Sequence, residues 1–199
     1  MTDQIARIRI TLDDIKPAIW RRVELPISNS LKTLHLAIQA VMLFENYHLF
    51  RFDIGEASYG IRFDDDYMDP PTRDAGNQRL TKLIERGVTA FSYTYDFGDD
   101  WRHSIVIEEV LSADPALHYP RFVDGARRAP PEDVGGLPGF EEFLEAMAKP
   151  RHPERKSVLQ WYGRPFDPDD ISPDEIHTRM ATLAKRRASG KAAHTINEA

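Results

Sequence analysis

Hydrophobic and polar residues alternate strictly in the first segment of the chain. Over residues 5–12, Ile8, Ile10 and Leu12 fall on one side and polar residues fall on the other. A period of two predicts a strand that is buried on one face only. A turn-forming segment at residues 13–17 and a second apolar run at residues 19–25 follow. Two strands joined this closely predict an antiparallel hairpin.

The period then changes to that of a helix. Apolar residues recur at positions 31, 34, 38, 41 and 42, directly after Ser30. This spacing predicts an amphipathic helix, and a serine in this place is a favoured N-cap. Such a helix needs a sheet on which to bury its apolar face, and the flanking strands would supply that sheet.

Further strands are expected over residues 48–54, 91–97 and 101–111. In the segment 91–97, Phe91, Tyr93, Tyr95 and Phe97 are expected to share one face, with the polar residues on the other. The turn at residues 98–100 would join the last two strands into a hairpin. Residues 112–139 are expected to be mostly loop, and helices are expected over residues 140–147 and 154–162 and from residue 173 onward.

Contiguous strands followed by helices indicate an α+β fold. We expect a mixed or antiparallel sheet with a covering helix, similar to a β-grasp or roll, and helices clustered toward the C-terminus. Residues 1–185 are expected to form a single domain, and residues 186–199 a basic, flexible tail.

The charge is distributed unevenly along the chain. The formal net charge is −6, yet residues 176–199 carry five basic residues and one acid, which leaves −10 on residues 1–175. A body this acidic repels phosphate backbones, so nucleic acid is an expected partner only through the basic tail. Helix-terminal basic residues also commonly form a solvated face that complements the helix dipole.

Several function classes are disfavoured by what the chain lacks. Its 199 residues include no cysteine, so no disulfide, thiolate metal site or thiol nucleophile is possible. No HExxH, P-loop, GxSxG or GxGxxG motif occurs. No basic cluster leads into an apolar run at the start and no membrane partner is expected, so we predict a cytoplasmic location.

The densest chemistry lies in the predicted hairpin turn, which carries Asp96, Asp99, Asp100, Trp101 and His103. Carboxylate and imidazole ligands drawn together by a turn are suited to a hard or borderline divalent cation. The alternative is that the aspartates are ordinary turn formers, that the tryptophan packs in the core and that the histidine is a strand residue.

A second candidate lies between a proline pair and a glycine pair, where Glu132 and Asp133 occupy a stiff loop. The alternative is that these acids cap the following helix. His35 and His48 are further candidate ligands or bases, against the reading that each is hydrogen-bonded at the core margin. The acidic run at residues 64–66 lacks the spacing of a calcium loop.

Several strings resemble one family when taken in order. They are IKPAIWRRV at residues 15–23, LH and IQ at 34–35 and 38–39, YHL at 47–49, YG at 59–60, YDFGDDWRH at 95–103, YPR at 119–121, PPEDVGG at 130–136 and FDP at 166–168. The chain thereby resembles the plasmid Orf-three-like family, first named from a root-inducing plasmid. The resemblance implies an α+β roll and carries no activity, although some relatives are associated with plasmids or transposons. Many relatives look to carry cysteines where this chain has Phe122 and Ala129.

Three hypotheses of function follow. The first is a non-catalytic binding module, in which the hairpin tip and the Glu132–Asp133 loop form an acidic, aromatic-edged cleft for a metal ion, a small cationic ligand or a basic protein segment. The second is a metal-dependent hydrolase that uses the same acids, with His35, His48 or His103 as the base. The third is a DNA-associated accessory factor of a mobile element, acting through the basic tail.

Overall fold

The computed structural model describes residues 3–61 and 71–197, and their side chains as far as residue 186, so the acidic run at 64–66 lies outside the described residues. The described part forms one eight-stranded sheet and five helices. In chain order the elements are β1 (Gln4–Leu12), β2 (Ile19–Pro26), α1 (Leu31–Met42), β3 (Phe50–Ile54), β4 (Ala57–Gly60), β5 (Arg73–Asp74), α2 (Leu80–Glu85), β6 (Ala90–Tyr95), β7 (Trp101–Ser112), β8 (Arg121–Ala126), α3 (Gly136–Ala148), α4 (Arg155–Tyr162) and α5 (Pro173–Asn197).

The strands lie in the order β5-β4-β3-β6-β7-β1-β2-β8. Every neighbouring pair is antiparallel except β4 and β5, so the sheet is mixed. The predicted hairpin of the first two strands is confirmed, with Ile8 paired to Val23. The predicted α+β class is confirmed as well.

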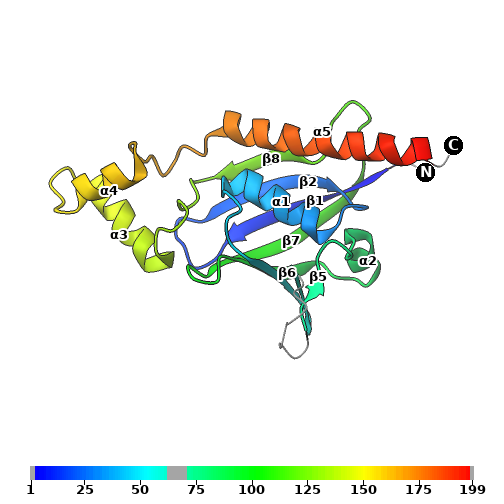
Figure 1. Ribbon diagram of the computed structural model, residues 1–199, viewed down its shortest axis with the longest axis horizontal. Helices are drawn as coiled ribbons and strands as arrows, with labels where there is room; N and C mark the ends of the chain where they lie inside the picture. The colour runs from blue at the N-terminus through cyan, green and yellow to red at the C-terminus, as the bar shows by residue number, and fades with distance from the viewer. Residues whose placement is uncertain (1–2, 62–70, 198–199) are drawn as a thin grey trace.

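Helix α1 lies across one face of the sheet, and α5 runs beside α1 and β8 (Figure 1). Ile8 and Ile10 of the sheet and Leu34 and Ile38 of α1 are completely buried in a single core. The predicted N-cap is confirmed, because the Ser30 hydroxyl accepts a hydrogen bond from the backbone N–H of Thr33 at 3.3 Å.

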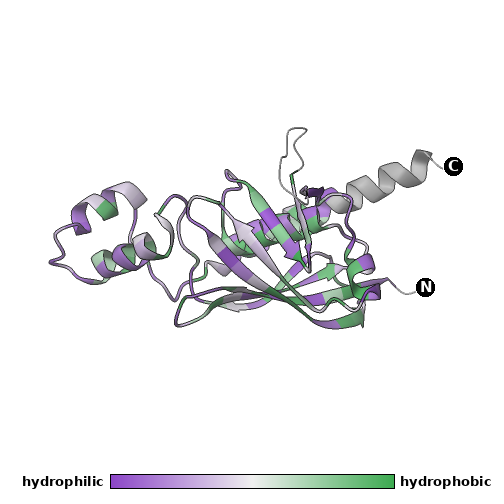
Figure 2. Cartoon of the chain, turned by 90° about the horizontal axis from the view of Figure 1, so that it is seen from below, coloured by the Kyte–Doolittle hydropathy of each residue, from purple (hydrophilic) through white to green (hydrophobic). Residues whose placement is uncertain are grey.

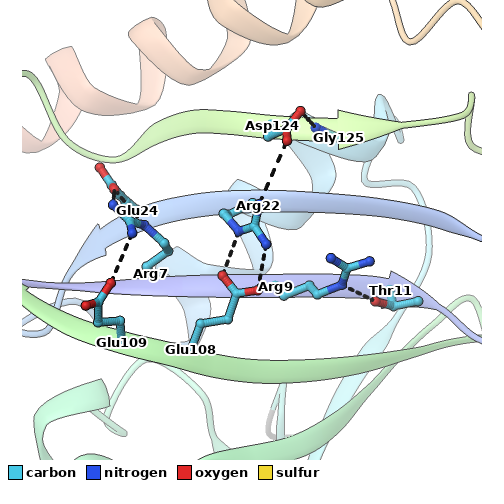
Figure 3. A network of polar contacts seen from close by, with 9 residues as sticks. All are labelled: Arg7, Arg9, Thr11, Arg22, Glu24, Glu108, Glu109, Asp124 and Gly125. Atoms are coloured by element: carbon cyan, nitrogen blue, oxygen red, sulfur yellow. Dashed lines mark hydrogen bonds and ion pairs between the residues drawn. The ribbon is translucent and has the colours of Figure 1, made fainter.

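The opposite face of the sheet carries a lattice of arginine–carboxylate pairs (Figure 3). Glu24 is almost fully buried and accepts from Arg7 at 2.8 Å and from Arg121 at 2.7 Å. Arg22 pairs with Glu108 at 2.6 Å. Two arginines hold the pKa of the Glu24 carboxyl below its ordinary value, although its burial acts in the opposite sense and is the largest single influence. Acidic side chains on this face are thus matched by bases.

Strand β8 was not expected, because residues 112–139 were predicted to be mostly loop. The strand pairs with β2 at the edge of the sheet. Of its six residues only Phe122 is buried, and Gly125 interrupts the apolar pattern. An edge strand covered by a helix needs little alternation of apolar and polar residues, which explains why the strand pattern of residues 121–126 is weak.

Helices α3 and α4 pack against each other and project beyond the sheet at the end opposite both termini (Figures 1 and 2). The helices predicted at 140–147 and 154–162 correspond to these two. Across residues 3–61 and 71–197, no helix is both long and apolar enough to cross a membrane.

Three of the site candidates lie in the core. Trp101 is buried and meets Phe140 of α3 edge-on, with ring centroids 6.3 Å apart. The rings of His35 and His103 both lie near Tyr93, and His35 Nδ1 is 2.8 Å from the Tyr93 hydroxyl. Burial lowers the pKa of each histidine to about 4. Both rings are therefore neutral core groups at neutral pH.

These two histidines predict a loss of stability in mild acid. In the unfolded chain each has a pKa near 6.5, so the unfolded state binds more protons between about pH 6.5 and pH 4. The stabilising contribution is complete above this window and declines as the pH falls through it, by up to about 1.4 kcal/mol per pH unit for each histidine. Urea unfolding at pH 7, 6 and 5 measures the slope. His35→Asn is expected to reduce the slope and the exposed control His118→Asn to leave it unchanged; equal slopes in all three proteins would refute this account.

Candidate functional site

The turn between β6 and β7 reverses the alternation of the strand that precedes it. Asp96 has a left-handed backbone with φ 56°, a conformation rare for residues other than glycine. As a result the Asp96 side chain is buried and Phe97 is 51% exposed, so the prediction that Phe97 lies on the same face as Tyr93 and Tyr95 is wrong. Backbone hydrogen bonds fix the turn: Asp96 N–H donates to the Leu49 carbonyl at 2.9 Å and Asp100 N–H donates to the Asp96 carbonyl at 2.7 Å.

The loop that precedes α3 lies against the tip of this hairpin. Gly135 N–H donates to the Asp99 carboxylate at 3.2 Å. Gly136 has φ 66°, and a Cβ atom there would lie 2.8 Å from the carbonyl oxygen of Asp99. Only glycine fits this close approach without displacement. The two acidic segments singled out in the sequence are therefore neighbours in space.

His48 lies where the two segments meet. Its Nε2 atom is 3.0 Å from Asp133 Oδ1, 3.6 Å from Asp96 Oδ2 and 3.8 Å from Glu132 Oε2. The approach to Asp133 is short, but its direction does not make a hydrogen bond, and His48 Nε2 and Glu132 Oε2 are both buried without a hydrogen-bond partner among the described residues. We call His48, Asp96, Glu132 and Asp133 the acidic cluster.

Tyr95 holds Glu132 in place. Its hydroxyl donates to Glu132 Oε1 at 2.8 Å and accepts from the backbone N–H of Tyr47 at 3.1 Å. The backbone N–H of Glu45 also donates to Glu132 Oε1, at 2.6 Å. Burial, and after it the hydrogen bond to Glu132, raises the pKa of the Tyr95 hydroxyl above its ordinary value. Tyr95 therefore remains a neutral donor, and Oε2 is the oxygen of Glu132 that is left for another partner.

The cluster is rich in negative charge and open on one side. No lysine or arginine in the described part of the chain makes an ion pair with Asp96, Glu132 or Asp133. The Asp96 side chain is only 9% exposed, whereas that of Asp133 is 67% exposed. An ion could thus reach the cluster from solvent on the Asp133 side.

The donor atoms suit a divalent metal ion. One atom each of His48, Asp96 and Asp133 lie within 4.8 Å of one another. Ligands at about 2.1 Å from a tetrahedral zinc ion are separated by about 3.4 Å, close to the separations from His48 Nε2. Imidazole favours zinc, iron or copper, and carboxylates favour manganese, magnesium or calcium, so the mixed set is best matched to zinc or manganese.

Not every predicted site residue joins the cluster. Trp101, His35 and His103 lie in the core, and the Asp100 carboxylate is exposed, 3.3 Å from Arg102. Asp99 contacts the glycine pair instead. Sequence reasoning missed Tyr95, which was expected to be a packing residue; the signal that could have revealed it is a tyrosine, with a hydroxyl to satisfy, directly before the turn.

A second feature missed from the sequence is a groove of about 530 Å³ that begins at Asp133 and lies along α3 and α4. Glu142, Glu145 and Glu154 line it together with Trp161, which is 53% exposed. Lys149 makes an ion pair with Glu145. We call this space the glutamate groove.

Known proteins share both the sequence and the fold. A family model for plasmid pRiA4b ORF-3-like proteins matches residues 4–175. The uncharacterised protein y4hQ of Sinorhizobium fredii (strain NBRC 101917 / NGR234) is 36% identical over 195 residues, which cover 94% of this chain and 100% of that protein. The crystal structure of MM3350, a protein of unknown function from Methanosarcina mazei Go1, has 32% identity and a TM-score of 0.80, and covers 88% of this chain and 97% of that one. The chain belongs to the plasmid pRiA4b ORF-3-like family, as its motifs indicate.

Proposed function

We propose that this protein is a cation-binding module whose acidic cluster holds one divalent metal ion, with zinc or manganese preferred. His48, Asp96 and Asp133 would be the protein ligands, and Glu132 Oε2 stands beside them as a fourth oxygen. The observation that carries the proposal is the pair of buried atoms without hydrogen bonds, His48 Nε2 and Glu132 Oε2, next to two further carboxylates. Buried polar atoms are normally paired, and a bound cation would pair both.

The hydrolase hypothesis has less support. Two of its three candidate bases, His35 and His103, are buried away from the cluster, and the third, His48, would be a ligand.

DNA binding through the tail stays a prediction. Arg179, which begins the basic run, is paired with Glu45 and Glu175 at 2.7 and 2.8 Å. Deleting residues 185–199 and measuring a salt-sensitive DNA affinity would test it.

The metal proposal predicts stoichiometric binding. Calorimetric titration of the full chain with Zn²⁺, Mn²⁺, Mg²⁺ and Ca²⁺ is expected to show one site that prefers the first two. At a free metal concentration of 100 times Kd, the bound ion would raise the free energy of unfolding by about 2.7 kcal/mol. Asp133→Asn is expected to weaken binding at least about tenfold, because it removes a charged ligand from an otherwise unchanged loop.

The matched control is Asp100→Asn, which removes an exposed carboxylate of the same hairpin outside the cluster. It is expected to bind the metal as the original chain does. Absence of binding for all four ions, or equal affinities in Asp133→Asn and the original chain, would contradict the proposal.

The glutamate groove supports a second cationic ligand, a basic protein segment. Trp161 offers an exposed aromatic face, beside Glu142 and Glu154, and arginine or lysine side chains bind to such faces and to carboxylates. This ligand would be recognised by side chains on α3 and α4 and not by the acidic cluster.

The test is a titration of the full chain with an arginine- and lysine-rich octapeptide, in which tryptophan fluorescence reports binding. Binding is expected to change the emission of Trp161, and Trp161→Phe should remove the change. The double variant Glu142→Gln/Glu154→Gln is expected to weaken binding roughly threefold to tenfold through loss of two exposed ion pairs. Glu141→Gln, next in sequence but outside the groove lining, is the control. Equal peptide affinity in the double variant and in the control would contradict the proposal that the glutamate groove binds a basic protein segment.

A further inference from the structure

A second cavity, of about 220 Å³, also has Glu132 in its lining but is richer in basic side chains. Four arginines border it, and we call it the arginine cavity. They come from β2, from the loop after β8, from the segment after α4 and from α5. In chain order they are Arg21, Arg128, Arg164 and Arg179.

Arg21 is a buried charge that no carboxylate neutralises. Its exposed fraction is 0%, and in the described part of the chain no acidic group makes an ion pair with it. Its Nε donates to the Val41 carbonyl at 2.8 Å, and its Nη1 donates to the carbonyls of Trp20 and Ala126 at 2.8 and 3.0 Å. Burial and the nearby Arg128 lower its pKa to about 10. Carbonyl dipoles thus stabilise the guanidinium only in part.

The position of Arg21 is fixed by its surroundings. A Cβ atom at Gly125 of β8 would lie 2.7 Å from Cδ of Arg21, so the arginine fills the space that glycine leaves. Its Nε bond to the Val41 carbonyl connects the last turn of α1 to the sheet, and its Nη1 bonds to Trp20 and Ala126 hold the guanidinium against β2 and β8. No described residue accepts a hydrogen bond from its Nη2.

Two further arginines border the same space. Arg128 is buried, donates to the Ser172 hydroxyl at 2.9 Å and lies 3.6 Å from a carboxylate oxygen of Asp170. Arg164 is exposed, and its Cζ atom lies 5.6 Å from the ring centroid of Tyr162. It makes no ion pair within the described ranges. A structural connection between α1 and the sheet does not require either of them.

Three carboxylates also border the cavity, and two of them are engaged with one of its arginines. Glu45 and Glu175 both pair with Arg179, and Glu132 Oε1 accepts from Tyr95. Two carboxylates therefore face Arg179, whereas Arg21 and Arg164 have no carboxylate partner among the described residues. Four guanidinium groups against three carboxylates give the lining a small excess of positive charge, which favours recognition of an oxyanion.

We propose that the arginine cavity binds the oxyanion group of a small molecule, a carboxylate or a phosphate, between Arg128 and Arg164, with the buried charge of Arg21 in the cavity lining. The planar guanidinium groups would donate paired hydrogen bonds to the anion oxygens. The cavity volume admits such a group with a few further atoms. This site adjoins the acidic cluster at Glu132 and does not require a bound metal.

The test is a titration of the full chain with sodium phosphate and, separately, with sodium acetate, both at low ionic strength. Binding is monitored through the NMR signals of the arginine side-chain Nε–H groups. Saturable shifts of the Arg21 and Arg128 signals with either anion support the site, and the tighter anion identifies the ligand class. Arg164→Gln and Arg128→Gln are each expected to weaken binding at least about tenfold. Arg21 itself is not replaced, since its loss could unfold the chain.

Two controls separate this site from general charge effects and from the metal proposal. Arg86→Gln removes an exposed arginine at the end of α2 and should leave anion affinity unchanged. Asp133→Asn should also leave it unchanged, because Asp133 does not border the arginine cavity. The inference is overturned if neither anion shifts the Arg21 signal, or if Arg164→Gln and Arg128→Gln bind as tightly as Arg86→Gln.

Discussion

The contact between the β6–β7 turn and the glycine pair ahead of α3 is the constraint on which the candidate site depends. Gly135 donates to the Asp99 carboxylate, and Gly136 approaches the backbone of Asp99 so closely that no side chain fits between them. Asp96 lies on one side of this contact, and Glu132 and Asp133 lie on the other. The distances from His48 to all three carboxylates therefore follow from a backbone approach that glycine alone permits.

The acidic cluster differs from the buried Glu24 in how its charge is balanced. On the outer face of the sheet, Glu24 is matched by two arginines. In the cluster, Asp96 and Glu132 are nearly as buried, yet their partners are backbone N–H groups, the Tyr95 hydroxyl and the ring of His48. Burying charge without a matching base is unfavourable, so an arrangement of this kind is more typical of a ligand site than of a structural ion pair.

Glu132 borders two spaces of opposite character. One of its oxygens faces His48 and the acidic cluster, and its side chain also borders the arginine cavity. Glu132 makes no ion pair with the arginines of the cavity, because Arg179 is paired with Glu45 and Glu175, and Glu132 is held by Tyr95.

The sequence alone determined the elements that are defined by local periodicity. The alternation around Ile8 and Ile10 and the helical spacing after Ser30 predicted the first hairpin, α1 and the α+β class, because burial of one face imposes a pattern that can be read along the chain. It also identified Asp96, His48, Glu132 and Asp133 as candidates, from residue type and turn chemistry. Tertiary structure decided which candidates meet: the left-handed backbone of Asp96 turned its side chain inward, and His35 and His103 were drawn into the core around Tyr93. Strand β8 and the arginine cavity likewise depended on contacts between segments far apart in the chain, for which no local pattern exists.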